Sequence, residues 1–457
     1  MAGIGFQLRR LTAPRTYTGV LGAYASAAAI SAGPWIISII ALMVLTWLLH
    51  QSLPGDQIRL FTASVTHVYA FALILTGPLQ IVLTRYTADC ISLKQEDRIF
   101  PSFKGGVALA AILSAILGGV FFFRFVHAGA MFSVFAAGLL VYVSCIFVAS
   151  VYLSALRKYY GIVFAFAAGY GSGVIAAWQL ALRYGVNGAM GGLLLGHLVL
   201  FVFLVICIRR ELRTSVGSAF AYMRSFLKFP DLMLCGLYYN VGIWIDKFLF
   251  WWLSQSNVRV SGALHAAPDY DLAIYLSLLS IAPGMAVFIL QVETDFAEKF
   301  HDYFETVNQG GTLSEVISAK RRLILSLRDG FNRLLKVQGV TTALLVIYAN
   351  ELTSWFNVSF IQIGIFRITL FGTFLLVMFL AMLTVLFYFN DRRGALLCSF
   401  VFLLANGILS AVTVVQNEAW YGFGFVVAAG LALFIAAARV NSRLENLEYH
   451  TFRIQPA

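Results

Sequence analysis

Long apolar segments alternate with short polar segments along the whole chain. An α-helix needs about 20 apolar residues to cross the hydrocarbon core of a bilayer, and each apolar segment is near that length. The pattern predicts twelve membrane-spanning helices, at residues 20–49, 61–84, 105–123, 130–153, 159–182, 188–208, 231–253, 271–292, 337–356, 364–389, 394–415 and 420–438. The expected fold class is therefore an all-α polytopic membrane protein.

The positions of lysine and arginine give an independent test of this helix count, because cytoplasmic loops are enriched in both. With a cytoplasmic N-terminus, most of the 32 basic residues fall in the even-numbered gaps or at the chain ends. The opposite side receives only Arg59, Arg124, Arg183 and Arg259. A missed helix would invert every later gap, so the charges favour twelve helices with both the N- and C-termini in the cytoplasm.

The helices are expected to form two six-helix bundles. Residues 1–208 make the N-terminal bundle, 209–230 a cytoplasmic linker, and 231–457 the C-terminal bundle. The second bundle contains a polar cytoplasmic loop at 293–336, in which apolar positions from Leu313 onward suggest an amphipathic helix with a basic face. Such a helix lies on the membrane surface or docks a partner. The alternative is a solvated linker.

Two of the predicted helices share a motif that suggests an internal duplication. The stretches LTGPLQIVLTRYTAD and IAPGMAVFILQVETD each contain a glycine–proline break and end in a threonine and an aspartate, as TAD and ETD. Parallel halves of this kind place a transport pathway at their interface. The breaks at Pro78 and Pro283, with Pro34 in the first helix, are candidate hinges, because proline removes a backbone hydrogen-bond donor and permits a kink.

Composition supports a membrane protein and excludes several other classes. Hydrophobic residues make up 60% of the chain and charged residues 12%, whereas a soluble domain carries about a quarter charged residues. The net charge of +11 then reflects the lysine and arginine bias of cytoplasmic loops rather than nucleic-acid binding. The five cysteines form no CxxC pair and are expected to be small buried side chains. The first apolar run is longer than the core of a signal peptide, which indicates a retained helix.

No catalytic constellation is recognisable. The sequence contains no GxSxG, HExxH or Walker motif, and the predicted cytoplasmic loops are too short for a nucleotide-binding domain. The chain is therefore not expected to be an enzyme, nor to hold a cofactor or a metal ion.

Charged residues inside a predicted helix are the strongest pointers to function, because each costs at least about 2.5 kcal/mol at the bilayer centre. Asp246 and Lys247 lie in the predicted helix 231–253. Adjacent helix positions point about 100° apart, so the two are not expected to face each other directly, and each needs another partner. They form either an interhelical structural ion pair or a contact to substrate or ion.

Aromatic and amide side chains near this pair suit a sugar, because sugar rings pack on aromatic faces and amides satisfy their hydroxyl groups. The candidate pathway residues are Asp246, Lys247, Asn240, Tyr239, Trp244 and Arg367, the last expected to reach the outer membrane surface.

Other polar and aromatic residues have simpler explanations. Arg85 and Glu293 end corresponding helices and are either interfacial residues or a cytoplasmic gate. His67 and His197 are expected to be hydrogen-bonded packing residues. Trp251 fits an aromatic belt at the membrane surface.

Three stretches resemble the PelG family. They are MAGIGFQLRRL followed by AYASAAAISAGPWIISI, then NVGIWIDKFLFW, and finally YDLAIYLSLLSIAPGMAVFILQVETDFAEKFHDYFETV. With the helix count, the likeness covers essentially the whole chain. It implies a multi-pass subunit of the bacterial inner membrane, in the superfamily of multidrug, oligosaccharidyl-lipid and polysaccharide flippases.

The resemblance also implies a function and partners. Members translocate Pel exopolysaccharide, which is rich in N-acetylgalactosamine, in concert with the cytoplasmic glycosyltransferase PelF and the membrane proteins PelD and PelE. PelD binds cyclic di-GMP. No catalytic residues carry over from the family. Two alternatives remain, an ion-coupled antiporter of lipid-linked oligosaccharides or small molecules, and a membrane scaffold without transport activity.

Overall fold

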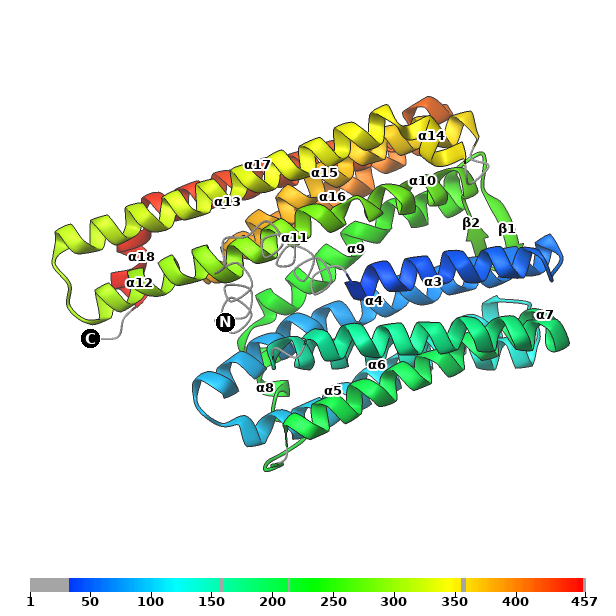
Figure 1. The fold of residues 1–457 in the computed structure, drawn as a ribbon, viewed down its shortest axis with the longest axis horizontal. Coiled ribbons are helices and arrows are strands. Elements are labelled where there is room, and N and C mark those ends of the chain that lie inside the picture. Colours follow the sequence, from blue (N-terminus) through cyan, green and yellow to red (C-terminus); the bar gives the residue numbers. More distant parts are fainter. Residues whose placement is uncertain (1–32, 157–158, 213, 355–358, 455–457) are drawn as a thin grey trace, which may run out of the picture. The chain divides into compact units, whose positions relative to one another are not determined.

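A computed structural model describes residues 33–156, 159–212, 214–354 and 359–454 (Figure 1). The first part of the predicted helix 20–49 lies outside the described residues. By packing, the described chain divides into two compact units, one of residues 34–268 and one that begins at Asp269.

Long helices account for most of the unit 34–268. They are α3 (Gly33–His50), α4 (Gly55–Ser92), α5 (Ile99–Val120), α6 (Ala130–Ala155), α7 (Tyr159–Glu211) and α9 (Pro230–Leu253). Short elements complete it, namely η1 (Glu96–Arg98), η2 (Phe121–Phe125), α8 (Met223–Lys228), and strands β1 (Val258–Ser261) and β2 (Leu264–Ala266). The two strands pair antiparallel.

The 53-residue helix α7 consists of two helices joined at Gly185, which has φ 60° and ψ −142°. A non-glycine residue rarely adopts this backbone conformation. The two arms return along each other and pack through small residues, so that a β-carbon on Gly196 would lie 2.3 Å from the Cα of Gly173. The predicted helices 159–182 and 188–208 are therefore separate helices with a tight turn between them.

Helix α9 packs closely on α4. A β-carbon on Gly236 would lie 2.4 Å from the carbonyl oxygen of Gly77, so the two backbones touch. By this packing α9 belongs to the unit that precedes it. The predicted bundles 1–208 and 231–457, which place α9 in the later half, stay a prediction.

The unit that begins at Asp269 is also built from long helices. They are α10 (Pro268–Leu279), α11 (Ile281–Gln291), α12 (Ala297–Asn308), α13 (Leu313–Ile347), α15 (Phe360–Tyr388), α16 (Arg392–Val414) and α17 (Phe423–Glu445). Shorter elements are the π-helical η3 (Val292–Phe296), α14 (Ala349–Ser354), η4 (Glu418–Trp420) and α18 (Leu447–Ile454).

The predicted polar loop 293–336 is helical. Through η3, α11 continues into α12, which turns at Gln309–Thr312 into the 35-residue helix α13. The predicted amphipathic segment and residues 337–347 of the ninth predicted membrane helix are thus one helix, which excludes an irregular solvated linker. The α12–α13 hairpin has its own apolar core, formed by residues such as Tyr303 and Leu323 with Leu447 of α18. Helix α18 lies beside this hairpin (Figure 1).

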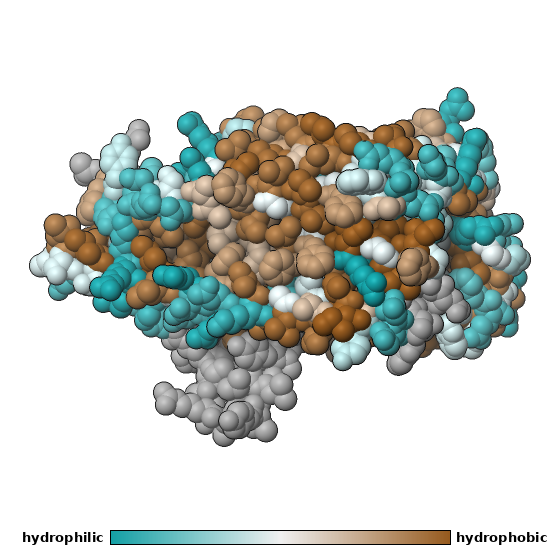
Figure 2. Space-filling model, turned by 90° about the horizontal axis from the view of Figure 1, so that it is seen from above, coloured by the Kyte–Doolittle hydropathy of each residue, from teal (hydrophilic) through white to brown (hydrophobic). Residues whose placement is uncertain are grey.

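Nine helices within the described residues are long and apolar enough to cross a membrane. They include both arms of α7 as one helix, and they do not include α9 or α13, which are less hydrophobic. Figure 2 shows a broad hydrophobic band between hydrophilic ends on the face that it presents. The protein is therefore a multi-pass helical membrane protein. The count of twelve spans and the cytoplasmic position of the termini stay predictions.

Candidate functional site

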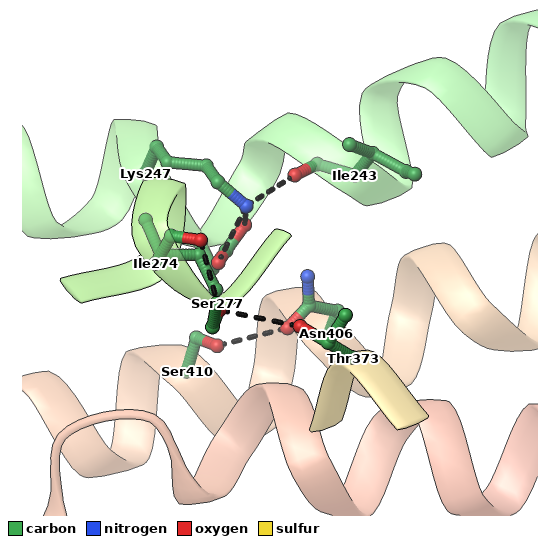
Figure 3. Close-up of polar contacts among 8 residues, drawn as sticks. Ile243, Lys247, Ile274, Ser277, Thr373, Asn406 and Ser410 are labelled. Atoms are coloured by element: carbon green, nitrogen blue, oxygen red, sulfur yellow. Dashed lines mark hydrogen bonds and ion pairs between the residues drawn. The ribbon is translucent and has the colours of Figure 1, made fainter. Parts of the chain in front are cut away.

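Asp246 and Lys247 form a direct ion pair inside α9. Both are buried, with 0% and 1% of their surface exposed. The lysine Nζ lies 3.1 Å from Oδ2 of the carboxylate and donates to the carbonyl oxygen of Ile243 at 2.8 Å (Figure 3). The prediction that neighbouring positions cannot pair is wrong here, because the long lysine side chain folds back along the helix and its ammonium reaches the carboxylate.

This pairing makes the intramembrane charges neutral as a unit. Two opposite charges in contact offset part of the cost of burying each charge in a low-dielectric interior. The local geometry therefore favours the structural interpretation of the pair, and a role in transport requires that the pair opens.

Asn240 and the break at Pro78 meet at the contact of α4 with α9. The Asn240 side chain donates from Nδ2 to the carbonyl oxygen of Gly236 at 2.8 Å. A β-carbon on Gly77, the residue before Pro78, would lie 2.3 Å from that same Nδ2. The amide thus fills the space that the glycine leaves open, and it holds the proline break of α4 against α9.

A stack of aromatic rings continues along α9. The indole of Trp251 is fully buried and stacks on the imidazole of His67, with centroids 4.2 Å apart. Trp244 lies next to Trp251, at 6.3 Å between ring centroids, and is 7% exposed. The placement of Trp251 in a surface belt is wrong, because its ring is covered by α4. Tyr239 is partly buried on the same helix.

A second polar cluster in this unit escaped the sequence analysis. The hydroxyl of Tyr69 donates to Nε2 of His197 at 2.9 Å and also contacts the hydroxyl of Tyr170. The other ring nitrogen of His197 donates to the carbonyl oxygen of Leu193 at 2.8 Å. The interpretation of His197 as a hydrogen-bonded packing residue agrees with this geometry, and its partners lie on α4 and on both arms of α7.

The proline break in the later unit is packed by an amide as well. Ser280 separates α10 from α11, and its carbonyl oxygen accepts from Nε2 of Gln338 at 3.0 Å. A β-carbon on Gly284, next to Pro283, would lie 2.3 Å from Oε1 of the same glutamine. Gln338 comes from α13 and is fully buried.

Further polar contacts join the helices of this later unit. Thr373 of α15 donates to Ser277 of α10 at 3.2 Å, and Ser410 donates to Asn406 within α16 at 3.0 Å (Figure 3). Arg367, near the start of α15, donates to Asn350 at 3.4 Å. Such contacts are expected where helices must satisfy polar groups inside a membrane.

A string of polar side chains runs between α11 and α13. Asp295 accepts from Ser326 and from Nε2 of Gln291, the latter at 3.3 Å. Arg333 donates to Oε1 of Gln291 at 3.4 Å. This aspartate ends the second of the two similar stretches, so that stretch contributes to the packing of α13.

The candidate gate is described only in part. Arg85 pairs with Asp89 one turn along α4 at 3.1 Å, and its guanidinium lies 5.4 Å from the ring centre of Phe229. The side chain of Glu293 lies outside the described residues. Pro34 lies in the first turn of α3, and the chain before Gly33 lies outside the described residues as well.

An ion cluster ties α17 to the turn between α15 and α16. Asp391 is 1% exposed and accepts from Arg439 at 2.8 Å and from Arg443 at 2.7 Å. It also accepts from the backbone N–H of Gly394 and so caps α16. Burial alone raises the pKa of this carboxyl, but the hydrogen bonds from Arg443, Arg439 and Gly394 outweigh burial and lower the pKa to about 2.

The family comparison covers almost the whole chain. Residues 1–452 match the family PelG, whose description reads "Putative exopolysaccharide Exporter (EPS-E)". The chain belongs to the PelG family. No curated protein matches it. The PelG resemblance predicted from the three sequence stretches is thereby confirmed.

Solved structures of transporters share the fold of this PelG-family chain. A MOP superfamily transporter from Pyrococcus furiosus has a TM-score of 0.66 at 13% identity, over 97% of this chain and 99% of that chain. An outward-facing multidrug resistance MATE family transporter of the MOP superfamily has a TM-score of 0.64 at 13% identity. The match covers 93% of this chain and 96% of that chain. The Vibrio cholerae MATE transporter VcmN in its bent form has a TM-score of 0.61 at 11% identity. The match covers 93% of this chain and 98% of that chain.

At these identities the likeness shows the fold alone. The family and the fold are those of transporters and not of enzymes. Within the described residues, no group of histidine, cysteine, aspartate or glutamate is placed to hold a metal ion.

Proposed function

We propose that this PelG-family protein moves Pel exopolysaccharide, a polymer rich in N-acetylgalactosamine, across the bacterial inner membrane. The family match over residues 1–452 carries the proposal, since the family is described as an exopolysaccharide exporter. The transporter fold and the nine apolar helices support it.

The polymer is made on the cytoplasmic side by the glycosyltransferase PelF, and PelD and PelE complete the assembly. The α12–α13 hairpin supports this part of the proposal, because it is a folded projection with its own core on the side predicted to be cytoplasmic. Lys320 of α13 fixes the C-terminal helix α18 to the hairpin through an ion pair with Glu448 at 2.6 Å. A rigid helical surface of this kind suits a docked synthase.

Helix α9 is the proposed lining of the polymer pathway. Tyr239 and Asn240 are only partly buried and offer a ring and an amide to a sugar. Asp246, Lys247, Trp244 and Arg367 complete the proposed set. Arg85 with Glu293 as a gate, and Pro34, Pro78 and Pro283 as hinges, belong to the same proposal.

Deleting the gene and complementing it tests this function. Surface polymer is expected to disappear in the deletion strain, while glycosyltransferase activity in the cytosolic fraction persists. The wild-type gene restores the polymer, and a Tyr239→Ala variant that is made at normal abundance restores less than a Tyr142→Ala control. Polymer on the surface of the deletion strain would refute the proposal.

A second candidate is an ion-coupled antiporter of lipid-linked oligosaccharides or small molecules. The buried Asp246–Lys247 pair favours it, since such a pair can exchange its internal partner for a cation. In proteoliposomes this candidate predicts that a protonophore stops transport and that Asp246→Asn uncouples it. Polymer export that continues after collapse of the ion gradients argues against it.

A further inference from the structure

The outward face of α13 changes character at Lys336. Residues at spacings of three and four share this face, including Arg321, Arg328, Lys336, Val340 and Leu344, and all are exposed. Such spacing places them in one stripe along the helix. On the C-terminal side of Lys336 the stripe is apolar. On the N-terminal side it is polar and carries the basic Arg321 and Arg328 together with the acidic Asp329 and the apolar Leu325.

The opposite face of α13 is packed. Leu323, Ser326, Leu334 and Gln338 are buried against the rest of the unit. In a multi-pass membrane protein, the exposed Val340 and Leu344, at 60% and 50%, face acyl chains. The helix therefore leaves the hydrocarbon near Lys336.

The helical rise separates the basic residues into two groups. At about 1.5 Å per residue, Arg333 lies about 5 Å along the axis from Lys336. A headgroup layer is about 5–8 Å thick, so both residues fall within it. Arg321 lies about 22 Å from Lys336 and is outside the layer.

The local geometry prepares Arg333 and Lys336 for a phosphate. Side chains of a helix lean toward its N-terminus, which here points them away from the hydrocarbon and into the headgroup layer. The guanidinium of Arg333 is held over the α11–α13 contact by its hydrogen bond to Oε1 of Gln291. It presents five N–H donors in total and is exposed, so donors remain for a ligand.

We infer that Arg333 and Lys336 of α13 form a binding site for the headgroup of an anionic phospholipid, whose acyl chains lie along Val340 and Leu344. The charges of the site are complementary to the phosphate, and the site continues the lipid-facing surface of the same helix. It is independent of the transported molecule.

The test uses the full-length protein reconstituted in vesicles of equal parts phosphatidylglycerol and phosphatidylcholine. The protein is extracted in mild detergent, and the phospholipids that remain bound are quantified by mass spectrometry. In the R333Q/K336Q variant, the ratio of bound anionic to zwitterionic lipid is expected to fall about 25-fold, since each basic residue near the surface contributes about fivefold. The R333K/K336R variant, which keeps both charges, is expected to retain the ratio.

The matched control is R321Q/R322Q, which removes two exposed arginines of the same helix outside the headgroup layer and is expected to leave the ratio unchanged. Lys336→Gln alone is measured as well, because it leaves the Arg333–Gln291 contact intact, and about a fivefold loss is expected. An unchanged ratio in R333Q/K336Q, or an equal loss in the control, overturns the inference. Loss of a captured cytoplasmic protein with an unchanged lipid ratio overturns it too, and assigns the face to a protein partner.

Discussion

The amide nitrogen of Asn240 on α9 fills the space beside Gly77 on α4 in which any other residue would place its β-carbon. In the later unit, the side chain of Gln338 fills the corresponding space beside Gly284. Both glycines are next to a proline that breaks the hydrogen-bond ladder of its helix. Each break is thus covered by an amide that can also hydrogen-bond to a backbone carbonyl, as Gln338 does at Ser280.

Gly77→Ala is expected to destabilise the protein by about 1–3 kcal/mol, because the added methyl group would overlap Asn240 and the Gly236 carbonyl. The loss of stability is measured by heating the detergent-solubilised protein and monitoring the remaining folded fraction by size-exclusion chromatography. Gly119→Ala is the control, since no atom lies within 4 Å of its β-carbon position in α5. Equal melting temperatures for the two variants would contradict the close contact of α4 with α9.

Removal of one member of the Asp246–Lys247 pair is expected to cost about 3–5 kcal/mol, because the other charge loses this buried ion pair. Asp246→Asn and Lys247→Met are compared with the double variant in the same unfolding assay. The double variant is expected to be more stable than the sum of the single effects implies. Strictly additive losses would show that the two charges do not interact.

Tyr69→Phe is expected to lower stability by about 1–3 kcal/mol, because Nε2 of His197 loses its donor in a buried setting. Combined with Tyr170→Phe, the loss should be less than additive by about 0.5 kcal/mol or more, since both hydroxyls belong to one hydrogen-bonded group. Tyr142→Phe, whose ring packs on Phe201, serves as the control and should change stability by less than about 0.5 kcal/mol. A similarly large loss of stability in Tyr142→Phe would show that the effect does not come from the hydrogen bond to His197.

Asp391 is expected to make stability pH-dependent in acid. Its pKa in the folded protein is about 2, below the ordinary value of 3.8, so its ion pairs stabilise the folded state fully above pH 3.8. That contribution is lost as the pH falls from 3.8 toward 2. Because Arg439 is partly exposed, the expected contribution of these ion pairs to the free energy of unfolding is reduced to about 1–2 kcal/mol.

Asp391→Asn checks this expectation by melting temperature between pH 2 and 5. The asparagine oxygen can still cap α16 at Gly394, but the acid-dependent loss should disappear. Asp302→Asn, at a more exposed pair with Lys299, is the control and should leave the acid-dependent loss in place. An unchanged pH profile in Asp391→Asn would assign the acid sensitivity to other carboxyls.

The two helices on either side of Gly185 could be predicted, because a short polar gap at 183–187 separates two apolar segments that are each long enough to cross a membrane. The helical character of 313–336 was harder to predict, since its arginines and other polar residues are also typical of a loop. Yet that stretch contains no proline, and its apolar positions follow the helical period into the next predicted span. The hairpin core shows why it is ordered: Leu447, from far along the chain, covers Tyr303 and Leu323.

The candidate site was predictable only where its chemistry is local. Asp246 and Lys247 stand out in any apolar helix, but their pairing depends on the lysine side chain bending back, which helical spacing does not describe. The contacts of Tyr69 join residues 101 and 128 positions away, so no sequence window contains them. Likewise Gln338 has no local feature that would assign it to the break at Ser280.

Helix α13 begins at a capping box in which Thr312 and Glu315 bond reciprocally, and it continues without interruption to Ile347. An unbroken α-helix is stiff along its axis. A displacement of the hairpin tip is therefore expected to move Gln338, about 39 Å along the helix, together with the rest of α13. Because Gln338 is bonded to the carbonyl of Ser280, the proline break between α10 and α11 is mechanically connected to the water-exposed tip. A partner that binds at that tip would therefore act on the same helix that carries the contact to Ser280.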